Sequence, residues 1–341
     1  MGLGTVLVTG GAGYIGSHSV LALAREAHEV VVYDDLSAGH REAVDAIDRA
    51  CPGRVRLVVG DIRDGATLER VMRDAQVSAV MHFAAWLSVG DSVTDPAGYY
   101  HNNVNGALSV LGAMLGAGVR AFIFSSTCAT YGDPVDTPMT ESHPQRPINA
   151  YGETKLAIER ALPHYARAYG LQWVALRYFN AAGADPGGLL GEDHHPEIHI
   201  VPRAIDAALG RDALRVFGDD YPTPDGTCLR DYIHVTDLAD AHVRALAWLA
   251  GGGASEAFNV GTGRPSSVLD VIRAVERVGG RPVAYTVGPR RDGDPPALYA
   301  ANDRISERLG WQPRHARLDD IVETAWRWHT SHPGGYAGTR H

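Results

Sequence analysis

The chain has 341 residues, enough for about two domains, and a globular composition with 45% hydrophobic and 21% charged residues. Its net charge is −9, arginine dominates the cations and lysine is nearly absent. Without a basic block, nucleic acid is excluded as the main partner, although a few local arginines can still hold a small anion. Apolar runs are far shorter than the ~20 residues of a membrane span, and no basic signal-peptide region precedes the first strand pattern. We therefore expect a cytoplasmic protein without a membrane partner.

Short apolar runs alternate with helical patterns through the first 180 residues. The predicted strands are Thr5–Thr9, Glu29–Asp34, Val55–Asp61, Ala79–Ala85, Arg120–Ser126 and Gln172–Asn180. The predicted helices between them are Ile15–Arg25, Ala66–Ala75, Pro96–Ala117 and Tyr151–Tyr169. Nearly continuous apolar strands are typical of a parallel sheet that is covered on both faces. The alternation predicts a doubly wound α/β fold with a parallel sheet of the Rossmann type.

Residues 181–230 are rich in glycine, proline and aspartate, and the α/β pattern resumes after them. Predicted elements in this second half are a helix at Pro202–Leu209, a strand at Tyr232–Val235, a helix to Ala250, a strand at Phe258–Gly261, a helix at Val268–Val278, a strand at Val283–Val287 and a helix at Leu318–Trp328. The change of texture predicts two domains: 1–180 plus 231–261, and a smaller, discontinuous α/β domain of 181–230 plus 262–341.

A glycine-rich turn joins the first strand to the first helix. Gly10, Gly13 and Gly16 permit a tight turn in which backbone N–H groups approach a pyrophosphate. The second strand ends in Asp34, 18 residues beyond Gly16, close to the spacing of the acid that binds the ribose hydroxyls of a dinucleotide. A carboxylate there repels a 2′-phosphate, so the pattern predicts NAD rather than NADP. Asp61 and Ile62 end the third strand and are candidates for the adenine edge.

Tyr151 and Lys155 stand four residues apart at the start of a predicted helix, so both side chains lie on one face. A tyrosine with a pKa of ~10 is a poor base at neutral pH, and a neighbouring cation stabilises its phenolate. Such a pair is usually an ordinary solvated one, but here it follows a dinucleotide pattern and a strand that ends in Ser125, Ser126 and Thr127. We expect a hydroxyl of Thr127 or Ser126 to share a substrate proton with Tyr151.

With these motifs the chain resembles the extended short-chain dehydrogenase/reductase superfamily, and within it the UDP-glucose 4-epimerases. The resemblance runs from Val6 to about Tyr336. It rests on VTGGAGYIGSH, VGDIRD, HFAA, YYHNNVNG, FSSTCATYGDP, YGETK, LRYFNAAGA, FGDDYPTPDGTCLRDYIHVTDLADAH, FNVGTG and RRDGDPP.

The resemblance implies roles for individual residues. Tyr151 would be the base, Lys155 its electrostatic partner and Thr127 the hydroxyl beside them. The implied NAD-binding residues are Gly10, Gly13, Tyr14, Ile15, Gly16, Asp34, Asp35, Asp61, Ile62, Phe83, Ala84, Asn102, Ser125, Tyr151, Lys155 and Tyr178. The implied substrate-binding residues are Thr127, Tyr151, Asn180, His199, Ile200, Phe217, Arg230, Tyr232, Arg291, Asp294 and Leu298. Independently of the family, Arg230 and Arg291 suit a diphosphate because guanidinium groups bind phosphate oxygens bidentately.

Two residues differ from the pattern of the family, and one segment has the composition of a metal site. Leu87 stands where some members carry lysine, so a cofactor contact from that side chain is lost, and Cys128 follows Thr127 where alanine is frequent. The segment 192–199 is dense in carboxylates and imidazoles, and His195 and His199 are four apart. Pro196 and the surrounding glycine and aspartate favour a loop, so we expect no metal.

The leading functional expectation is reversible inversion at C4 of a UDP-hexose, UDP-glucose or UDP-galactose, through a transient 4-keto sugar with NAD retained. The alternatives are a UDP-N-acetylglucosamine or UDP-pentose 4-epimerase, a nucleotide-sugar 4,6-dehydratase and a non-catalytic NAD-sensing protein. Cys128 and Ala129 replace the acid pair that the dehydratases need. Leu298, or Tyr299 if the alignment slips by one residue, is the expected position beside the hexose 2-substituent. The resemblance also implies a homodimer that pairs the helices at 96–117 and 151–169.

Overall fold

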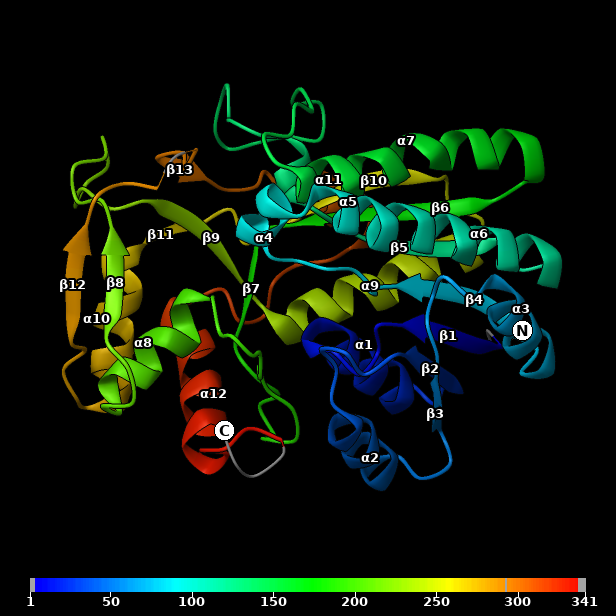
Figure 1. Ribbon diagram of the computed structural model, residues 1–341, viewed down its shortest axis with the longest axis horizontal. Helices are drawn as coiled ribbons and strands as arrows, with labels where there is room; N and C mark the ends of the chain where they lie inside the picture. The colour runs from blue at the N-terminus through cyan, green and yellow to red at the C-terminus, as the bar shows by residue number, and fades with distance from the viewer. Residues whose placement is uncertain (1–3, 292, 337–341) are drawn as a thin grey trace.

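The computed structural model describes residues 4–291 and 293–336 and has at its centre a seven-stranded parallel sheet (Figure 1). The strand order is β10-β6-β5-β4-β1-β2-β3. Their bounds are β1 Thr5–Thr9, β2 Val30–Asp34, β3 Val55–Val59, β4 Val77–His82, β5 Ala121–Thr127, β6 Gln172–Tyr178 and β10 Glu256–Val260. Chain order reverses at β1, so β1 and β4 enclose the crevice where ligands of such sheets bind. The predicted doubly wound α/β fold is confirmed.

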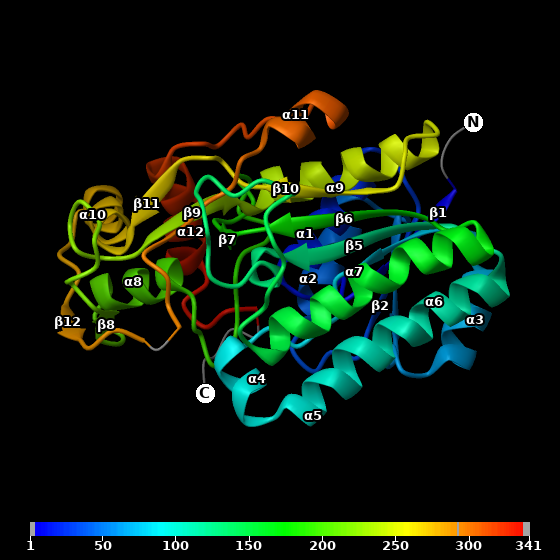
Figure 2. The same ribbon diagram turned by 90° about the horizontal axis from the view of Figure 1, so that it is seen from above.

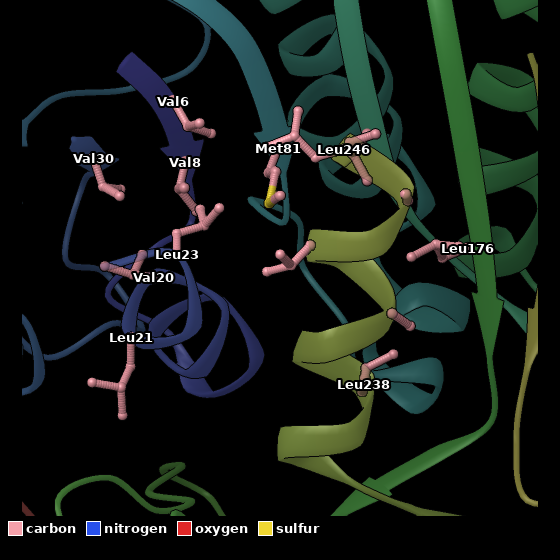
Figure 3. Packing of buried hydrophobic residues seen from close by; sticks show 14 of the residues in the cluster. Val6, Val8, Val20, Leu21, Leu23, Val30, Met81, Leu176, Leu238 and Leu246 are labelled. Carbon is pink, nitrogen blue, oxygen red and sulfur yellow. The ribbon is translucent and has the colours of Figure 1, made fainter. Parts of the chain in front are cut away.

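Alternate residues of the buried strands face two different hydrophobic cores. Val6 and Val8 point to one face and Leu7 to the other, because successive side chains of a strand alternate. The first face is covered by α1 Tyr14–Arg25, α2 Arg41–Ala50 and α9 Val235–Ala250, and the second by α3 Gly65–Asp74, α6 Gly106–Ala117 and α7 Ala150–Tyr169. Figure 2 shows α9 and α7 on opposite sides of the sheet, and Figure 3 shows Leu238 and Leu246 of α9 in the core with Val8 and Met81.

A smaller part of the chain lies beyond the carboxyl ends of the large sheet (Figure 1). Its strands are β7 Asn180–Ala182, β8 Leu214–Phe217, β9 Leu229–His234, β11 Pro265–Ser267, β12 Tyr285–Gly288 and β13 Ala297–Leu298. Strand β9 pairs with β7, β11 and β13, whereas β8 pairs with β12. Helices α8 Ile200–Ala208, α10 Val268–Gly279 and α12 Leu318–Ser331 share a third core. Strand β9 thus belongs to the small sheet, whereas α9 and β10 belong to the large sheet and its helices. The predicted division into two domains, with 231–261 in the first, stays a prediction.

The predicted helix Pro96–Ala117 is divided in the structure. It consists of α5 Pro96–Tyr99, a π-helical segment Tyr100–Asn105 and α6, and α4 Val89–Thr94 precedes it. π-Helical segments are frequent at functional sites, and this one carries Asn102 and Asn103. The sequence patterns did not predict several elements that the structure shows. These are α2, α4, β8, β11, β13, a 3₁₀ turn at Cys128–Thr130 and α11 Asp303–Leu309. Among the helices of the described residues, none has the length and apolarity needed to cross a lipid bilayer.

Candidate active site

The glycine turn between β1 and α1 brings three backbone segments into close contact. Gly10 has a φ of 71°, and a Cβ on it would lie 2.5 Å from the backbone nitrogen of Ala84. A Cβ on Gly16 would lie 2.1 Å from the carbonyl oxygen of Gly10. Helix α1 begins after Gly13 with no side-chain cap and no acidic residue in its first turn. Its free N–H groups and positive dipole end therefore suit an anionic phosphate group.

Asp34 ends β2 beside this turn, and its carboxylate is buried. The carboxylate accepts hydrogen bonds from the backbone N–H groups of Ala12, at 3.0 Å, and Leu36, at 2.9 Å. Burial raises the pKa of Asp34, and the two backbone hydrogen bonds oppose that rise. The side chain is thus fixed at the mouth of the crevice, where a carboxylate can accept hydrogen bonds from ribose hydroxyls.

Tyr151, Lys155 and Thr127 meet where β5 ends and α7 begins. Asn149 caps α7 by accepting a hydrogen bond from the N–H of Gly152. A Cβ on Gly152 would lie 2.5 Å from the carbonyl oxygen of Ala129, so only glycine lets the helix approach the turn after β5 this closely. This close approach carries Tyr151 to Thr127, and both side chains line the same cavity.

Lys155 is the only lysine of the chain, against 30 arginines. Its Nζ donates a hydrogen bond to the carbonyl oxygen of Ser125 at 2.9 Å and lies 6.0 Å from the centre of the Tyr151 ring. Burial lowers the pKa of Lys155 to about 8. The pKa of Tyr151 is raised, chiefly by burial and then by Tyr178, while the Thr127 side chain lowers it. Ionisation of the phenol therefore depends on nearby positive charge.

A cavity of about 460 Å³ connects the glycine turn with this centre and continues toward the small sheet. Of the predicted site residues, those that line it are Gly10, Gly13, Tyr14, Ile15, Gly16, Asp34, Asp35, Ile62, Phe83, Ala84, Asn102, Thr127, Tyr151, Lys155, Tyr178, Asn180, His199, Arg230, Asp294 and Leu298. Leu298 lines the cavity, whereas Tyr299 is not among its described lining residues.

Six predicted residues lie outside the described lining of the cavity: Asp61, Ser125, Ile200, Phe217, Tyr232 and Arg291. Ser125 is directly behind it, because its hydroxyl lies 2.8 Å from the Tyr178 hydroxyl and its carbonyl holds Lys155. Asp61 pairs with the guanidinium of Arg63, which lowers the pKa of the carboxyl. Arg291 stacks on Phe217, with its guanidinium carbon 3.9 Å from the ring centre.

Arg230 and Asp294 form an ion pair at the end of the cavity beside the small sheet. The Arg230 guanidinium pairs with the Asp294 carboxylate and donates hydrogen bonds to the carbonyl oxygens of Leu229, at 2.7 Å, and Pro295, at 3.0 Å. These contacts hold the arginine in one orientation at the wall of the cavity. A fixed guanidinium is suited to bind phosphate oxygens.

Sequence reasoning missed the buried side chain of Asn103. Its amide donates hydrogen bonds to the carbonyl oxygen of Trp86 and the hydroxyl of Thr154, and its oxygen accepts from the N–H of Trp86 and the amide of Asn102. Asn103 therefore ties the loop after β4 and the neighbouring Asn102 to α7. The repeated asparagine in YYHNNVNG was the available signal, but spacing alone does not tell which asparagine points inward.

The parallel sheet, the glycine turn and the buried Tyr–Lys pair define a dinucleotide-binding protein of the extended short-chain dehydrogenase/reductase type. The model of the NAD dependent epimerase/dehydratase family matches residues 6–261, and the chain belongs to this family.

Within this family, the chain is similar over nearly its whole length to UDP-glucose 4-epimerases. The chain is 52% identical to the UDP-glucose 4-epimerase of Rhizobium meliloti (strain 1021) over 95% of this chain and 97% of that one. The structure of UDP-glucose 4-epimerase from Brucella ovis in complex with NAD matches with a TM-score of 0.91 and 51% identity, covering 95% of this chain and 98% of that chain. The enzyme of Stenotrophomonas maltophila with bound NAD and formylated UDP-arabinopyranose matches with a TM-score of 0.93 and 40% identity, covering 96% and 98%. The predicted resemblance is confirmed.

Proposed function

We propose that this chain catalyses the reversible inversion at C4 of a UDP-hexose, with UDP-glucose and UDP-galactose as the preferred pair. The observation that carries the proposal is the position of the Tyr151–Lys155 pair. The pair lines the same cavity as the glycine turn and Asp34 at one end and Arg230 at the other. The hexose carbon that reacts can therefore lie between the base and a bound dinucleotide.

The residues present fit NAD. The N-terminus of α1 offers N–H groups without a competing acidic side chain, and the buried Asp34 carboxylate disfavours a 2′-phosphate. Tyr14, Ile15, Ile62, Phe83, Ala84, Asn102 and Tyr178 would form the surrounding wall. When bound, NAD would supply reversible hydride acceptance from C4 of the sugar, which inversion at this carbon requires.

The protein's own residues handle the proton and the sugar. Tyr151 removes the proton from the C4 hydroxyl, and the positive charge of Lys155 stabilises the phenolate that does so. Thr127 shares the hydrogen bond between the phenol and the hydroxyl. The 4-keto sugar stays bound through its diphosphate, which Arg230 holds, while the ring turns over and presents its other face.

A nucleotide-sugar 4,6-dehydratase would need an additional acid–base pair to eliminate water. The positions after Thr127 are Cys128 and Ala129, and burial raises the pKa of Cys128 to about 12, so this thiol stays protonated at neutral pH. A non-catalytic NAD-binding protein would have no need of a buried Tyr–Lys pair. Both alternatives are therefore disfavoured.

One experiment separates these functions. Purified protein is incubated with UDP-galactose without added NAD, and the products are resolved by chromatography. We expect UDP-glucose without net NADH. A 4-keto-6-deoxy sugar would indicate a dehydratase, and unchanged UDP-galactose with and without added NAD would refute catalysis. UDP-N-acetylglucosamine and a UDP-pentose, tested in the same assay, decide the sugar class.

We also propose a homodimer formed through α6 and α7. Large hydrophobic side chains are exposed along these helices. They are Leu108 on α6, Tyr100 just before α6, and Tyr169 at the end of α7. Figure 2 shows the two helices side by side on the outer face of the sheet. Light scattering at micromolar concentration should give the mass of two chains, and a monomer mass would refute the proposal.

A further inference from the structure

Four potential metal ligands converge in the segment that leads into α8. Glu192, His194, Glu197 and His199 each contribute one ligand atom, and these atoms all lie within 4.8 Å of one another. The sequence analysis noted His195 and His199 in this segment and expected no metal, but the structure leaves His195 exposed and places His194 in the cluster. Glu192 is only 3% exposed, and Glu192, His194 and His199 line the wall of the cavity.

The distances between imidazole and carboxylate atoms are those of ligands around one small ion. His199 Nδ1 lies 2.8 Å from Glu192 Oε1 and 3.2 Å from Glu197 Oε1. His194 Nδ1 lies 3.3 Å from Glu192 Oε1 and 3.7 Å from Glu197 Oε2. Zinc bonds of ~2.0–2.1 Å in a tetrahedron place neighbouring ligand atoms about 3.3 Å apart. The four separations scatter around this value.

Hydrogen bonds satisfy the four side chains only in part, since one links His199 Nδ1 to Glu197 Oε1 at 3.2 Å. Glu192 Oε1 and His194 Nδ1 are buried atoms without a hydrogen-bond partner among the described residues. An unsatisfied buried polar atom costs about 1–3 kcal/mol, and more when it is charged. A shared ion would satisfy both of these atoms, which the contacts within the cluster leave without a hydrogen bond.

The rest of the fold holds the segment in place. The backbone N–H of Gly191 donates to the hydroxyl of Tyr336, and the Asp193 carboxylate accepts from the N–H of Tyr336. The carboxylate of Glu197 accepts from the N–H groups of Ile198 and His199, each at 2.8 Å. The segment is thus tied to Tyr336, and backbone N–H groups hold the Glu197 carboxylate, which is the condition for a preorganised metal site.

We propose that Glu192, His194, Glu197 and His199 form a site for one divalent transition-metal ion, with zinc as the best match. Two imidazoles disfavour magnesium and calcium, which prefer oxygen ligands, and two carboxylates neutralise the charge of a buried dication. Four protein ligands leave no open position, so the ion is structural rather than catalytic. It fixes the cavity wall, and coordination through Nδ1 of His199 leaves Nε2–H free to donate to a ligand in the cavity. This inference does not rest on the proposed function.

The test uses untagged full-length protein that has been treated with a chelator and then dialysed. Zinc is titrated in competition with a chromogenic chelator, and bound metal is counted by mass spectrometry after gel filtration. We expect one zinc per chain, which excess magnesium does not displace. Glu192→Gln and His194→Gln should each weaken zinc binding at least tenfold, whereas His195→Gln, next in the chain but exposed, should leave it unchanged.

Visible absorption of bound Co²⁺ provides a second measurement, which reports the geometry of the site and does not depend on how well one variant folds. Co²⁺ in four-coordinate N/O surroundings gives a strong visible absorption, which weak six-coordinate surface binding does not give. We expect that absorption in the wild type and in His195→Gln, and its loss in His194→Gln. Two results would each overturn the proposal: less than one zinc per chain at micromolar concentrations, or equal losses in His194→Gln and His195→Gln.

Discussion

Replacement of the single lysine by methionine should change how stability depends on pH. Lys155 is 4% exposed, and no carboxylate among the described residues forms an ion pair with it. Its Nζ donates to the carbonyl oxygen of Ser125, and burial lowers its pKa from 10.5 to about 8. The folded protein therefore carries this charge at neutral pH at a cost in stability.

The size of the cost follows from the two pKa values. Between pH 8 and 10.5 the unfolded chain keeps a proton that the folded chain releases, so stability rises with pH in this window. At ~1.4 kcal/mol per pKa unit, the penalty is about 3 kcal/mol at pH 7 and about 1 kcal/mol at pH 9.5. Lys155→Met has no such penalty. The stability of the variant relative to the wild type should therefore fall by about 2 kcal/mol between these two pH values.

Urea unfolding of the cofactor-free protein, followed by tryptophan fluorescence at both pH values, measures this difference. Comparing the pH dependence cancels the hydrogen bond that methionine cannot make, because that loss is the same at both pH values. Arg160→Met on the exposed side of α7 is the matched control, since a guanidinium stays charged throughout. If the difference between Lys155→Met and wild type changes no more than it does for the control, the reasoning is refuted.

Four further predictions concern the site and its support. Tyr151→Phe should keep the fold, as judged by circular dichroism, and reduce kcat at least ~10²-fold, the lower range for loss of proton transfer; near wild-type kcat would remove the assignment. Lys155→Arg should lose as much activity as Lys155→Met, because a planar guanidinium is larger than the buried ammonium it replaces; retained activity would show that charge alone suffices. Leu298→Tyr should lower kcat/KM for the N-acetyl sugars about 10- to 100-fold relative to the plain hexoses, since overpacking costs ~1–3 kcal/mol; an unchanged ratio would show that Leu298 does not contact the 2-substituent. Arg177→Leu should lower the free energy of unfolding by ~3–5 kcal/mol because it leaves the buried Glu159 carboxylate unpaired, whereas Arg327→Leu at an exposed helix pair should cost less than ~1 kcal/mol.

The parts of the molecule that depend on local sequence could be predicted. Continuous β-branched runs gave the strands of the large sheet, because both faces of a parallel sheet are buried. The glycine turn and Asp34 depend on a strand, a turn and a helix that follow one another in the chain. Tyr151 and Lys155 are one helical turn apart, so their common direction follows from helix geometry alone.

Contacts between distant segments could not be predicted in the same way. The pairing of Arg230 with Asp294 spans 64 residues, and the pairing of β9 with three short strands decides which residues face the cavity. Hydrophobic pattern says little about strands of two or three residues such as β11 and β13. For the same reason the sequence could not tell His194 from His195, since only the path of the loop decides which imidazole turns inward.

The distribution of cations supports the proposed role of Lys155. The chain has 30 arginines, and many of them form ion pairs or hydrogen bonds with carbonyl groups, where a planar guanidinium with five N–H donors fits best. An arginine stays protonated in proteins, so burial cannot bring its pKa near neutrality. A lysine ammonium is compact, and burial has lowered the pKa of Lys155 to about 8. Arginine thus serves where a fixed charge and geometry are needed, and the one lysine lies beside the buried phenol of Tyr151, whose pKa its charge would lower in the proposed mechanism.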